Sequence, residues 1–134
     1  MIALDTNILI YACDKSDLKR QQVALDLISY ASDGVLLWQV ACEFVAASRK
    51  LRPQGFTTVA AWDRLADYLA LFPLILPTSG AFRRARVLNT EEGWSFSDAM
   101  IVAACLECGV TRFYSEDVPG RTLREPLEIV NPFR

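Results

Sequence analysis

The chain has 134 residues, of which 52% are hydrophobic and 22% are charged, and its net charge at pH 7 is −2. These values predict one compact domain over residues 1–134 and exclude a disordered chain. They show no global basic field of the kind that nucleic-acid binders carry, although a local patch or bound cations can supply positive potential. No apolar run approaches the roughly 18 residues of a membrane helix. No Lys or Arg precedes the first apolar stretch, so we expect no secretory signal and a cytoplasmic location.

The residue types available for chemistry are limited, because the sequence contains no histidine. This excludes His-based acid–base catalysis, Ser-His-Asp triads and His-ligated zinc. Cys105 and Cys108 form a C-x-x-C pair, but no second pair completes a zinc site. We therefore expect these two and the remaining cysteines, Cys13 and Cys42, to be small buried apolar residues in a reducing compartment.

The first predicted element is a strand over residues 2–4, whose uninterrupted apolar residues suit a strand buried on both faces of a parallel sheet. Asp5 ends this run. Thr6 and Asn7 offer cap side chains for a helix that begins near Ile8. Asp5 is thus expected at the carboxyl end of a strand, the edge at which open α/β sheets bind ligands. A carboxylate there is costly to bury unless something pairs with it.

Helical spacing of apolar residues from Ala24 to Ala31 predicts the next helix, with Gly34 as its stop. A second buried strand is predicted over residues 35–38, followed by a helix over residues 39–51.

In the helix over residues 39–51, Val40, Glu43, Phe44 and Ala47 follow the i, i+3, i+4, i+7 pattern, so Glu43 shares the core-facing stripe. Basic residues gather at the end of this helix, at Arg49, Lys50 and Arg52.

Thr57 or Thr58 is the predicted cap of a helix whose apolar stripe is Trp62, Leu65, Leu69 and Phe72. Two prolines then bracket a short strand or extended link over residues 73–77.

Thr78 or Ser79 caps a helix with arginines on its polar side, and residues 89–94 form a loop. An apolar helix runs from Ser95 or Ser97 to Cys108, and Gly109 closes it. The remaining expected elements are a strand over residues 110–114, the Ser115–Asp117 segment, a turn at Pro119 and Gly120, and a last strand over residues 127–130.

Strands that alternate with helices predict an α/β fold with a mainly parallel sheet of four to five strands and right-handed crossovers. This topology places Asp5 and Asp117 after strands, and Glu43 and Asp98 in the first turns of helices, at the same edge of the sheet. Carboxylates gathered there repel one another, and their desolvation costs several kcal/mol per charge. A divalent cation would compensate these charges, and a site made of oxygen ligands suits Mg²⁺ or Mn²⁺.

Each acid also has a purely structural interpretation, which the sequence leaves open. Asp5 can be a helix N-cap, and the spacing from Ser95 to Asp98 has the form of a capping box. Asp117 and Ser115 can stabilise a turn through hydrogen bonds to its backbone, and Glu43 can be a solvated helix residue.

Four short motifs in this order resemble those of the PIN domain family, which includes the VapC toxin ribonucleases of bacterial toxin–antitoxin pairs. They are Leu4-Asp-Thr-Asn-x-x-x-Tyr11, Gln39-Val-x-x-Glu43-Phe, Ser95-x-x-Asp98-Ala and Tyr114-Ser-x-Asp117. The resemblance covers nearly the whole chain, and it implies a three-layer α/β/α fold.

The resemblance also implies a metal-dependent endoribonuclease that leaves 5′-phosphate and 3′-hydroxyl ends. Its metal-binding acids correspond to Asp5, Glu43, Asp98 and Asp117, which would hold one or two Mg²⁺ or Mn²⁺ ions. Polar helpers around them correspond to Thr6, Asn7 and Ser115. The implied partners are RNA, a cognate antitoxin whose C-terminal segment fills the groove, and a second copy of the chain.

Several further side chains are candidates for contacts with RNA or partners. The possible phosphate contacts are Arg49, Lys50, Arg52, Arg83, Arg84, Arg86, Arg121 and Arg124. Trp94 and Phe96 are candidates for base stacking, although core packing also explains them. The aromatic residues Trp62, Tyr68 and Phe72 make their helix a candidate contact surface for the antitoxin or the second copy.

Two other functions remain open at this point. One is a phosphotransfer domain in which Asp5 accepts a phosphoryl group, although Asn7 stands where the D-x-D motif needs its second acid. The other is a non-catalytic binding module that retains the acids for structure. A dinucleotide site is excluded because no G-x-G-x-x-G follows any strand.

Overall fold

The structure is a computed structural model that describes residues 1–118 and 126–134. Within these residues, five strands form one parallel sheet in the order β3-β2-β1-β4-β5. The strands are β1 (Ile2–Leu4), β2 (Gly34–Leu37), β3 (Leu74–Ile75), β4 (Arg112–Tyr114) and β5 (Glu128–Val130).

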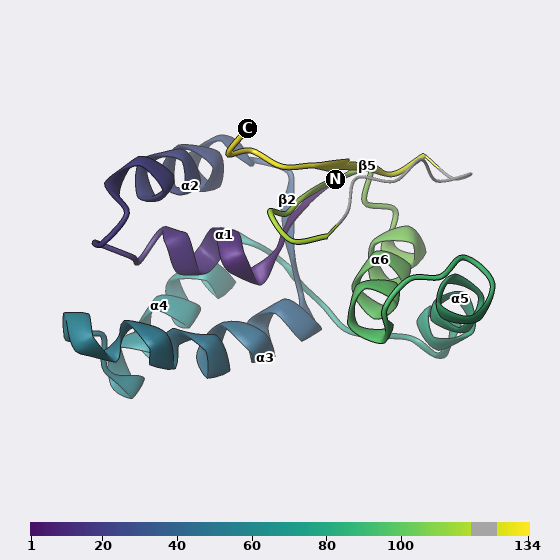
Figure 1. Cartoon of the computed structure of the whole chain (residues 1–134), viewed down its shortest axis with the longest axis horizontal. Helices are drawn as coiled ribbons and strands as arrows, with labels where there is room; N and C mark the ends of the chain where they lie inside the picture. The colour runs from purple at the N-terminus through teal and green to yellow at the C-terminus, as the bar shows by residue number, and fades with distance from the viewer. Residues whose placement is uncertain (119–125) are drawn as a thin grey trace.

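Helices cover both faces of the sheet, with α1 to α4 on one side and α5 and α6 on the other (Figure 1). Their bounds are α1 (Thr6–Tyr11), α2 (Leu18–Tyr30), α3 (Trp38–Ala47), the 3₁₀ helix η1 (Ser48–Gln54), α4 (Thr58–Leu71), α5 (Ser79–Thr90) and α6 (Phe96–Cys108). This arrangement confirms the predicted α/β fold and its three layers. Within the described ranges, no helix has the length and apolar character needed to cross a membrane.

The strand order creates a crevice beside β1. The chain leaves β1 toward β2 and β3 on one side, and later returns to β4 and β5 on the other. The connections after β1 and β4 therefore diverge, and such a switch point opens a crevice at the carboxyl ends of the two strands. The N–H of Asp5 donates to the carbonyl of Tyr114 at 2.9 Å, which holds these two strand ends together.

The core lies on both faces of the sheet. Among the largest fully buried side chains are Phe44 from α3, Phe113 from β4, and Ile8 and Leu9 from α1. The short helix α1 therefore packs by its apolar residues directly after Asp5, and this packing fixes where that carboxylate lies.

Three predicted boundaries near the first strands are wrong. Helix α1 begins at Thr6 rather than near Ile8, because the Asp5 carboxylate is the cap and accepts from the N–H of Thr6. Helix α2 ends at Tyr30, so Gly34 is not its stop but the first residue of β2. A Cβ at Gly34 would lie 2.7 Å from the ring of Phe72, so this position needs a glycine for close packing.

Other boundaries shift by a few residues. Trp38 begins α3 instead of ending β2, and the predicted helix over residues 39–51 changes to 3₁₀ geometry at Ser48. Helix α5 extends to Thr90, into the predicted loop. Strands β4 and β5 start later than predicted, whereas Gly109 ends α6 as expected, with a left-handed φ of 80°.

The predicted apolar stripe of α4 is only partly right. Leu65 and Phe72 are buried, but Trp62 and Leu69 are exposed, and Ala61 and Tyr68 take their places in the core. A buried tyrosine is tolerated here because its hydroxyl donates to the carbonyl of Leu9 at 3.2 Å. Tyr68 and Phe72 are thus not available as partner surface.

The expectation that the cysteines are buried is confirmed for two of the four. Cys13 and Cys105 are buried, but Cys108 is half-buried and Cys42 is exposed on α3. Burial raises the pKa of the Cys105 thiol, which keeps it protonated and inert.

Candidate active site

The four acids singled out from the sequence line one cavity of about 150 Å³ at the carboxyl edge of the sheet. They come from four segments: Asp5 follows β1, Glu43 is in α3, Asp98 opens α6 and Asp117 follows β4. The other lining residues are Thr6, Asn7, Gln39, Ser97, Ile101 and Val118.

Asp5 is the most buried of these acids, with 7% of its surface exposed. Its Oδ1 accepts from the N–H of Thr6 at 2.7 Å, and its Oδ2 accepts from the Ser115 hydroxyl at 2.7 Å. Burial raises the pKa of Asp5 from 3.8 to about 6, against the two hydrogen bonds, and the nearby charges of Glu43 and Asp117 raise it further. Asp5 can thus serve both as the structural cap of α1 and as a carboxylate that favours a cation beside it.

Ser115 connects Asp5 to the segment after β4. Its Oγ accepts from the N–H groups of Asp117 at 3.2 Å and Val118 at 3.0 Å. Because those two contacts use the oxygen as an acceptor, the hydroxyl proton is directed to the Asp5 carboxylate. The side chain is 1% exposed, so water does not compete for this arrangement.

Glu43 is oriented through both of its carboxylate oxygens. The Thr6 hydroxyl donates to Oε2 at 3.0 Å, and the Gln39 amide donates to Oε1 at 3.0 Å. Gln39 was not among the residues predicted from the sequence to act at the site. Its position four residues before Glu43 in one helix is the signal that could have identified it.

Asp98 and Asp117 are the more accessible acids. The Ser95 hydroxyl accepts from the N–H of Asp98 at 3.2 Å, so Ser95 caps α6 as predicted. Within residues 1–118 and 126–134, the Asp98 carboxylate makes no reciprocal contact with Ser95 and stays directed to the cavity. Asp117 is exposed and accepts from the Asn7 amide at 3.1 Å.

The cavity is acidic, and none of the described residues that line it is a Lys or Arg. Within the described parts of the chain, no Lys or Arg forms an ion pair with any of these four carboxylates. Nor do three acidic or cysteine side chains there lie close enough together to hold a metal ion as they stand. The surrounding donors are hydroxyl, amide and carboxylate oxygens, a set that fits Mg²⁺ or Mn²⁺ rather than zinc.

The basic residues predicted to contact phosphates do not gather at one place as the four acids do. Arg49, Lys50 and Arg52 are exposed on η1, at the opposite end of α3 from Gln39. On α5, Arg84 pairs with Glu107 at 3.0 Å, whereas the other two predicted arginines of that helix, Arg83 and Arg86, are exposed. Arg121 and Arg124, like the turn at Pro119 and Gly120, lie outside the described residues.

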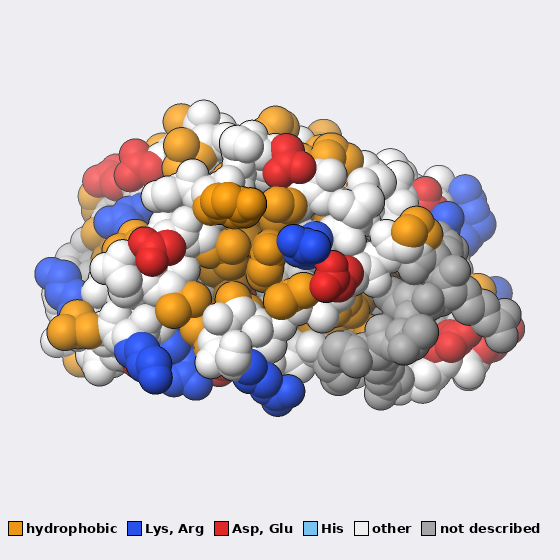
Figure 2. Space-filling view, turned by 90° about the horizontal axis from the view of Figure 1, so that it is seen from above, with side chains coloured by type: hydrophobic (Ala, Val, Ile, Leu, Met, Phe, Trp, Pro, Cys, Tyr) orange, Lys and Arg blue, Asp and Glu red, His pale blue; other side chains and the backbone are white. Residues whose placement is uncertain are grey.

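In Figure 2, the Lys and Arg side chains of the described residues are spread over the visible face, and hydrophobic side chains gather in its middle. Of the two aromatic candidates for stacking, Trp94 is buried in the core, and only Phe96 is exposed. Phe96 is thus the one of the two that a base can reach.

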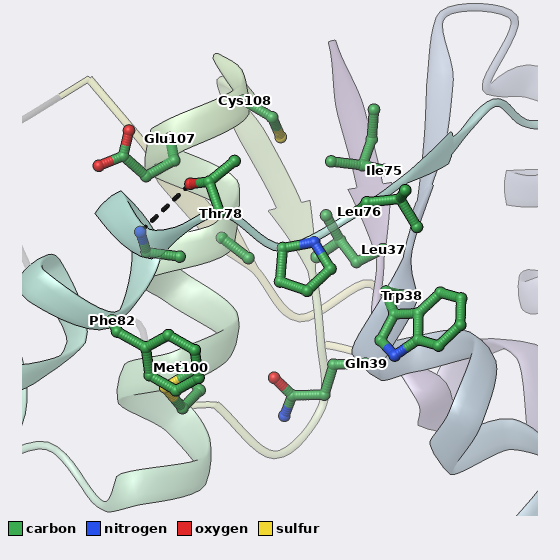
Figure 3. Close-up of a pocket in the computed structure, with 13 residues that line it drawn as sticks. Leu37, Trp38, Gln39, Ile75, Leu76, Thr78, Phe82, Met100, Glu107 and Cys108 are labelled. Atoms are coloured by element: carbon green, nitrogen blue, oxygen red, sulfur yellow. Dashed lines mark hydrogen bonds between the residues drawn. The ribbon is translucent and has the colours of Figure 1, made fainter.

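An apolar pocket of about 210 Å³ adjoins the acidic cavity, and Gln39 lines both. Trp38 lies on one side of it, and Phe82 and Met100 lie on the other (Figure 3). Trp38 is 47% exposed, Phe82 60% and Leu76 61%, so this pocket leaves large apolar surfaces in contact with water.

A doubly wound α/β domain with a carboxylate-lined cavity at its switch point is the class of protein that the fold and site define. The sequence model of the PIN domain family matches residues 2–118, and the chain belongs to this family. The fold is similar to that of a chain in a structure described as "Toxin-antitoxin complex from Klebsiella pneumoniae", with a TM-score of 0.66 and 18% sequence identity over 98% of each chain. No curated protein matches the sequence.

Proposed function

We propose that this protein is a metal-dependent endoribonuclease that hydrolyses RNA phosphodiester bonds. The observation that carries the proposal is the convergence of Asp5, Glu43, Asp98 and Asp117 on one cavity without a basic partner among the described residues. Membership of the PIN domain family supports a nuclease over an aspartyl phosphotransfer domain. An RNA substrate also favours a cytoplasmic location.

Asp5, Glu43 and Asp98 are the residues that would hold one or two Mg²⁺ or Mn²⁺ ions, with Asp117 completing the site. A divalent cation bound there would supply Lewis-acid chemistry, polarising the phosphate and making water acidic enough to attack near neutral pH. The carboxylate oxygens provide the hard donors that either ion prefers.

The polar neighbours orient these carboxylates through hydrogen bonds. Ser115 and the N–H of Thr6 hold the two oxygens of Asp5, and Thr6 and Gln39 hold those of Glu43. Side chains fixed in this way lose little conformational entropy when they bind a ligand. Asn7 performs the same role for Asp117.

RNA would be held mainly through its phosphates. Exposed cations suited to such contacts are Arg49, Lys50, Arg52, Arg83 and Arg86. Arg84 would have to leave Glu107 first, and the proposed contacts of Arg121 and Arg124 rest on the sequence alone.

We also propose that the protein is the toxin of a type II toxin–antitoxin pair and forms a homodimer. The exposed apolar pocket beside the cavity supports a protein partner, since Trp38, Leu76 and Phe82 would lose water on contact. The similar fold in a toxin–antitoxin complex supports the antitoxin assignment. Sedimentation tests the dimer, and a small protein that co-purifies and blocks cleavage in stoichiometric amounts tests the antitoxin.

The decisive experiment is cleavage of structured RNA by the purified protein with Mn²⁺, with Asp5→Asn as the control. Cleavage by wild type that EDTA and the substitution both abolish supports the proposal. Equal cleavage by the two proteins would show a contaminating nuclease. RNA binding with no cleavage in any divalent metal would instead favour a non-catalytic module.

A further inference from the structure

Glu116, which precedes the fourth acid of the cavity, is held by two side chains from other parts of the chain. The Tyr11 hydroxyl donates to Oε1 at 2.9 Å, and the Arg20 Nε donates to Oε2 at 3.0 Å. Both oxygens of the carboxylate are therefore engaged, and the side chain cannot rotate without losing a charge-assisted hydrogen bond.

Arg20 is itself fixed in place. It donates to the Asp17 carboxylate at 3.2 Å, and its guanidinium lies 5.6 Å from the Tyr11 ring centroid and 5.5 Å from that of Phe133. The Tyr11 and Phe133 rings contact each other edge to face at 5.0 Å. These contacts join α1, α2 and the segment after β5 into one cluster, and cation–π contacts of this kind restrict a guanidinium further.

The Asp117 side chain is less restrained than its backbone, which Ser115 holds by accepting from the N–H groups of Asp117 and Val118. Asp117 is exposed, and its carboxylate accepts only from Asn7 among the described residues. Asn7 also accepts from the N–H of Glu116, but at 3.4 Å. Fixing the Glu116 side chain therefore limits how far the next residue can move from the cavity.

We propose that Glu116 is a positioning residue, held by a clamp of Tyr11, Arg20 and Phe133, that places Asp117 at the acidic cavity. This inference deepens the proposed function and rests on it for the role of Asp117. The Arg20–Glu116 pair is partly exposed, with 42% and 24% of the two side chains accessible, so its contribution to overall stability is small. Its effect falls instead on the local geometry of the segment after β4.

A matched control exists elsewhere in the chain. Arg84 donates from Nε to Glu107 at 3.0 Å, with 36% and 31% of those side chains exposed. Glu107→Ala therefore removes an ion pair of the same geometry on α5 and α6, away from the four acids. Any effect specific to the clamp must exceed that of this substitution.

The first arm of the test needs no metal. In EDTA, the protection factors of the Asp117 and Val118 amides against hydrogen exchange should be at least about threefold lower in Glu116→Ala than in Glu107→Ala, because local opening then costs less. Tyr11→Phe, which keeps the ring on Arg20 and Phe133 and loses only the hydroxyl, should shift exchange in the same direction by less. Exchange equal to that of Glu107→Ala in both variants would overturn the clamp.

The second arm measures Mn²⁺ affinity by calorimetry. Glu116→Ala should raise the Kd by about threefold to tenfold, while its melting temperature in EDTA matches that of Glu107→Ala. This is less than the roughly 10–100-fold that follows loss of a residue in contact with a metal ligand, because Glu116 acts on Asp117 through the backbone. If Glu116→Ala does not fold, the Mn²⁺ Kd of Tyr11→Phe tests the proposal instead, and it should rise by less. An unchanged Kd contradicts the placement of Asp117. If wild type shows no binding that depends on Asp5, the metal function fails, and the exchange arm still decides the clamp.

Discussion

Replacing Asp5 by Asn should stabilise the metal-free protein above neutral pH, although it removes a central acid of the cavity. Burial raises the pKa of Asp5 from 3.8 to about 6 in the folded chain. At about 1.36 kcal/mol for each pKa unit, that difference corresponds to about 3 kcal/mol of folding free energy lost when Asp5 is ionised. An amide of the same shape carries no charge and does not incur this cost.

The sign follows from proton binding. Because the folded-state pKa lies above the unfolded value, the folded chain binds more protons than the unfolded chain in this range. The contribution of Asp5 is fully present below about pH 4 and is lost as the pH rises through about 6. Wild type should therefore weaken over this interval, and Asp5→Asn should not show that loss.

The full 3 kcal/mol will not be recovered. Asp5 accepts from both Thr6 and Ser115, whereas the asparagine can offer an oxygen to only one of them and an N–H₂ to the other. One mismatched buried hydrogen bond costs about 1 kcal/mol or slightly more. The expected net gain of Asp5→Asn is about 1–2 kcal/mol near pH 8. Near pH 4 the wild type recovers most of the roughly 3 kcal/mol, so the variant should there be less stable by about 1 kcal/mol.

Urea unfolding followed by tryptophan fluorescence, in EDTA at several pH values, measures these differences. Asp63→Asn on α4 is the control, since Asp63 is exposed and lies outside the cavity. Millimolar Mn²⁺ should reverse the order by stabilising wild type and not Asp5→Asn. A wild type whose stability stays level between about pH 4 and 7, together with an Asp5→Asn variant that is destabilised near pH 8, would refute the reasoning.

Three further substitutions test other parts of the site and fold. Ser115→Ala removes a donor that lowers the pKa of Asp5, so the acid limb of Mn²⁺-dependent cleavage should move to higher pH, and unfolding should be easier by about 1–3 kcal/mol. Gln39→Ala should raise the Mn²⁺ Kd several-fold with little change in stability, because the amide orients a ligand from the cavity wall. Gly34→Ala should destabilise by about 1–3 kcal/mol in urea, since its Cβ would lie 2.7 Å from the Phe72 ring.

Gly80→Ala is a matched control for Gly34→Ala. A Cβ at Gly80 would lie 2.9 Å from the Glu107 carboxylate, the end of a flexible side chain that can move away. Gly80→Ala should therefore cost clearly less than Gly34→Ala. Equal costs would mean that packing against Phe72 is not the reason for the glycine at β2.

The convergence of the four acids follows from topology alone. Asp5 and Asp117 follow strands, whereas Glu43 and Asp98 lie in helices that begin near strand ends, and a parallel sheet brings all such positions to one edge. Strand and helix periodicity carry that information locally, so one sequence is enough to predict it. The roles of these acids in metal binding and cleavage remain proposals.

Some features of the structure could not be predicted from the sequence. They depend on contacts between distant residues or on competition between similar side chains for the core. Tyr11 and Glu116 are 105 positions apart, and no local pattern marks their hydrogen bond. In α4, several apolar residues compete for the core, and the small side chain of Ala61 fits where Trp62 does not. Gly34 follows a helix and therefore resembles a helix stop, and only the position of Phe72 shows its actual role.

The hydrogen bond between Ser115 and Asp5 spans 110 positions of sequence, and β4 pairs directly with β1. During synthesis, the first acid leaves the ribosome long before the segment that orients it. A nascent chain therefore cannot present the assembled cavity until β4 has emerged and docked, because domains complete their distant pairings only when those segments are available. If the protein has the nuclease activity proposed above, the message being translated is therefore out of its reach until β4 has been made and has paired with β1.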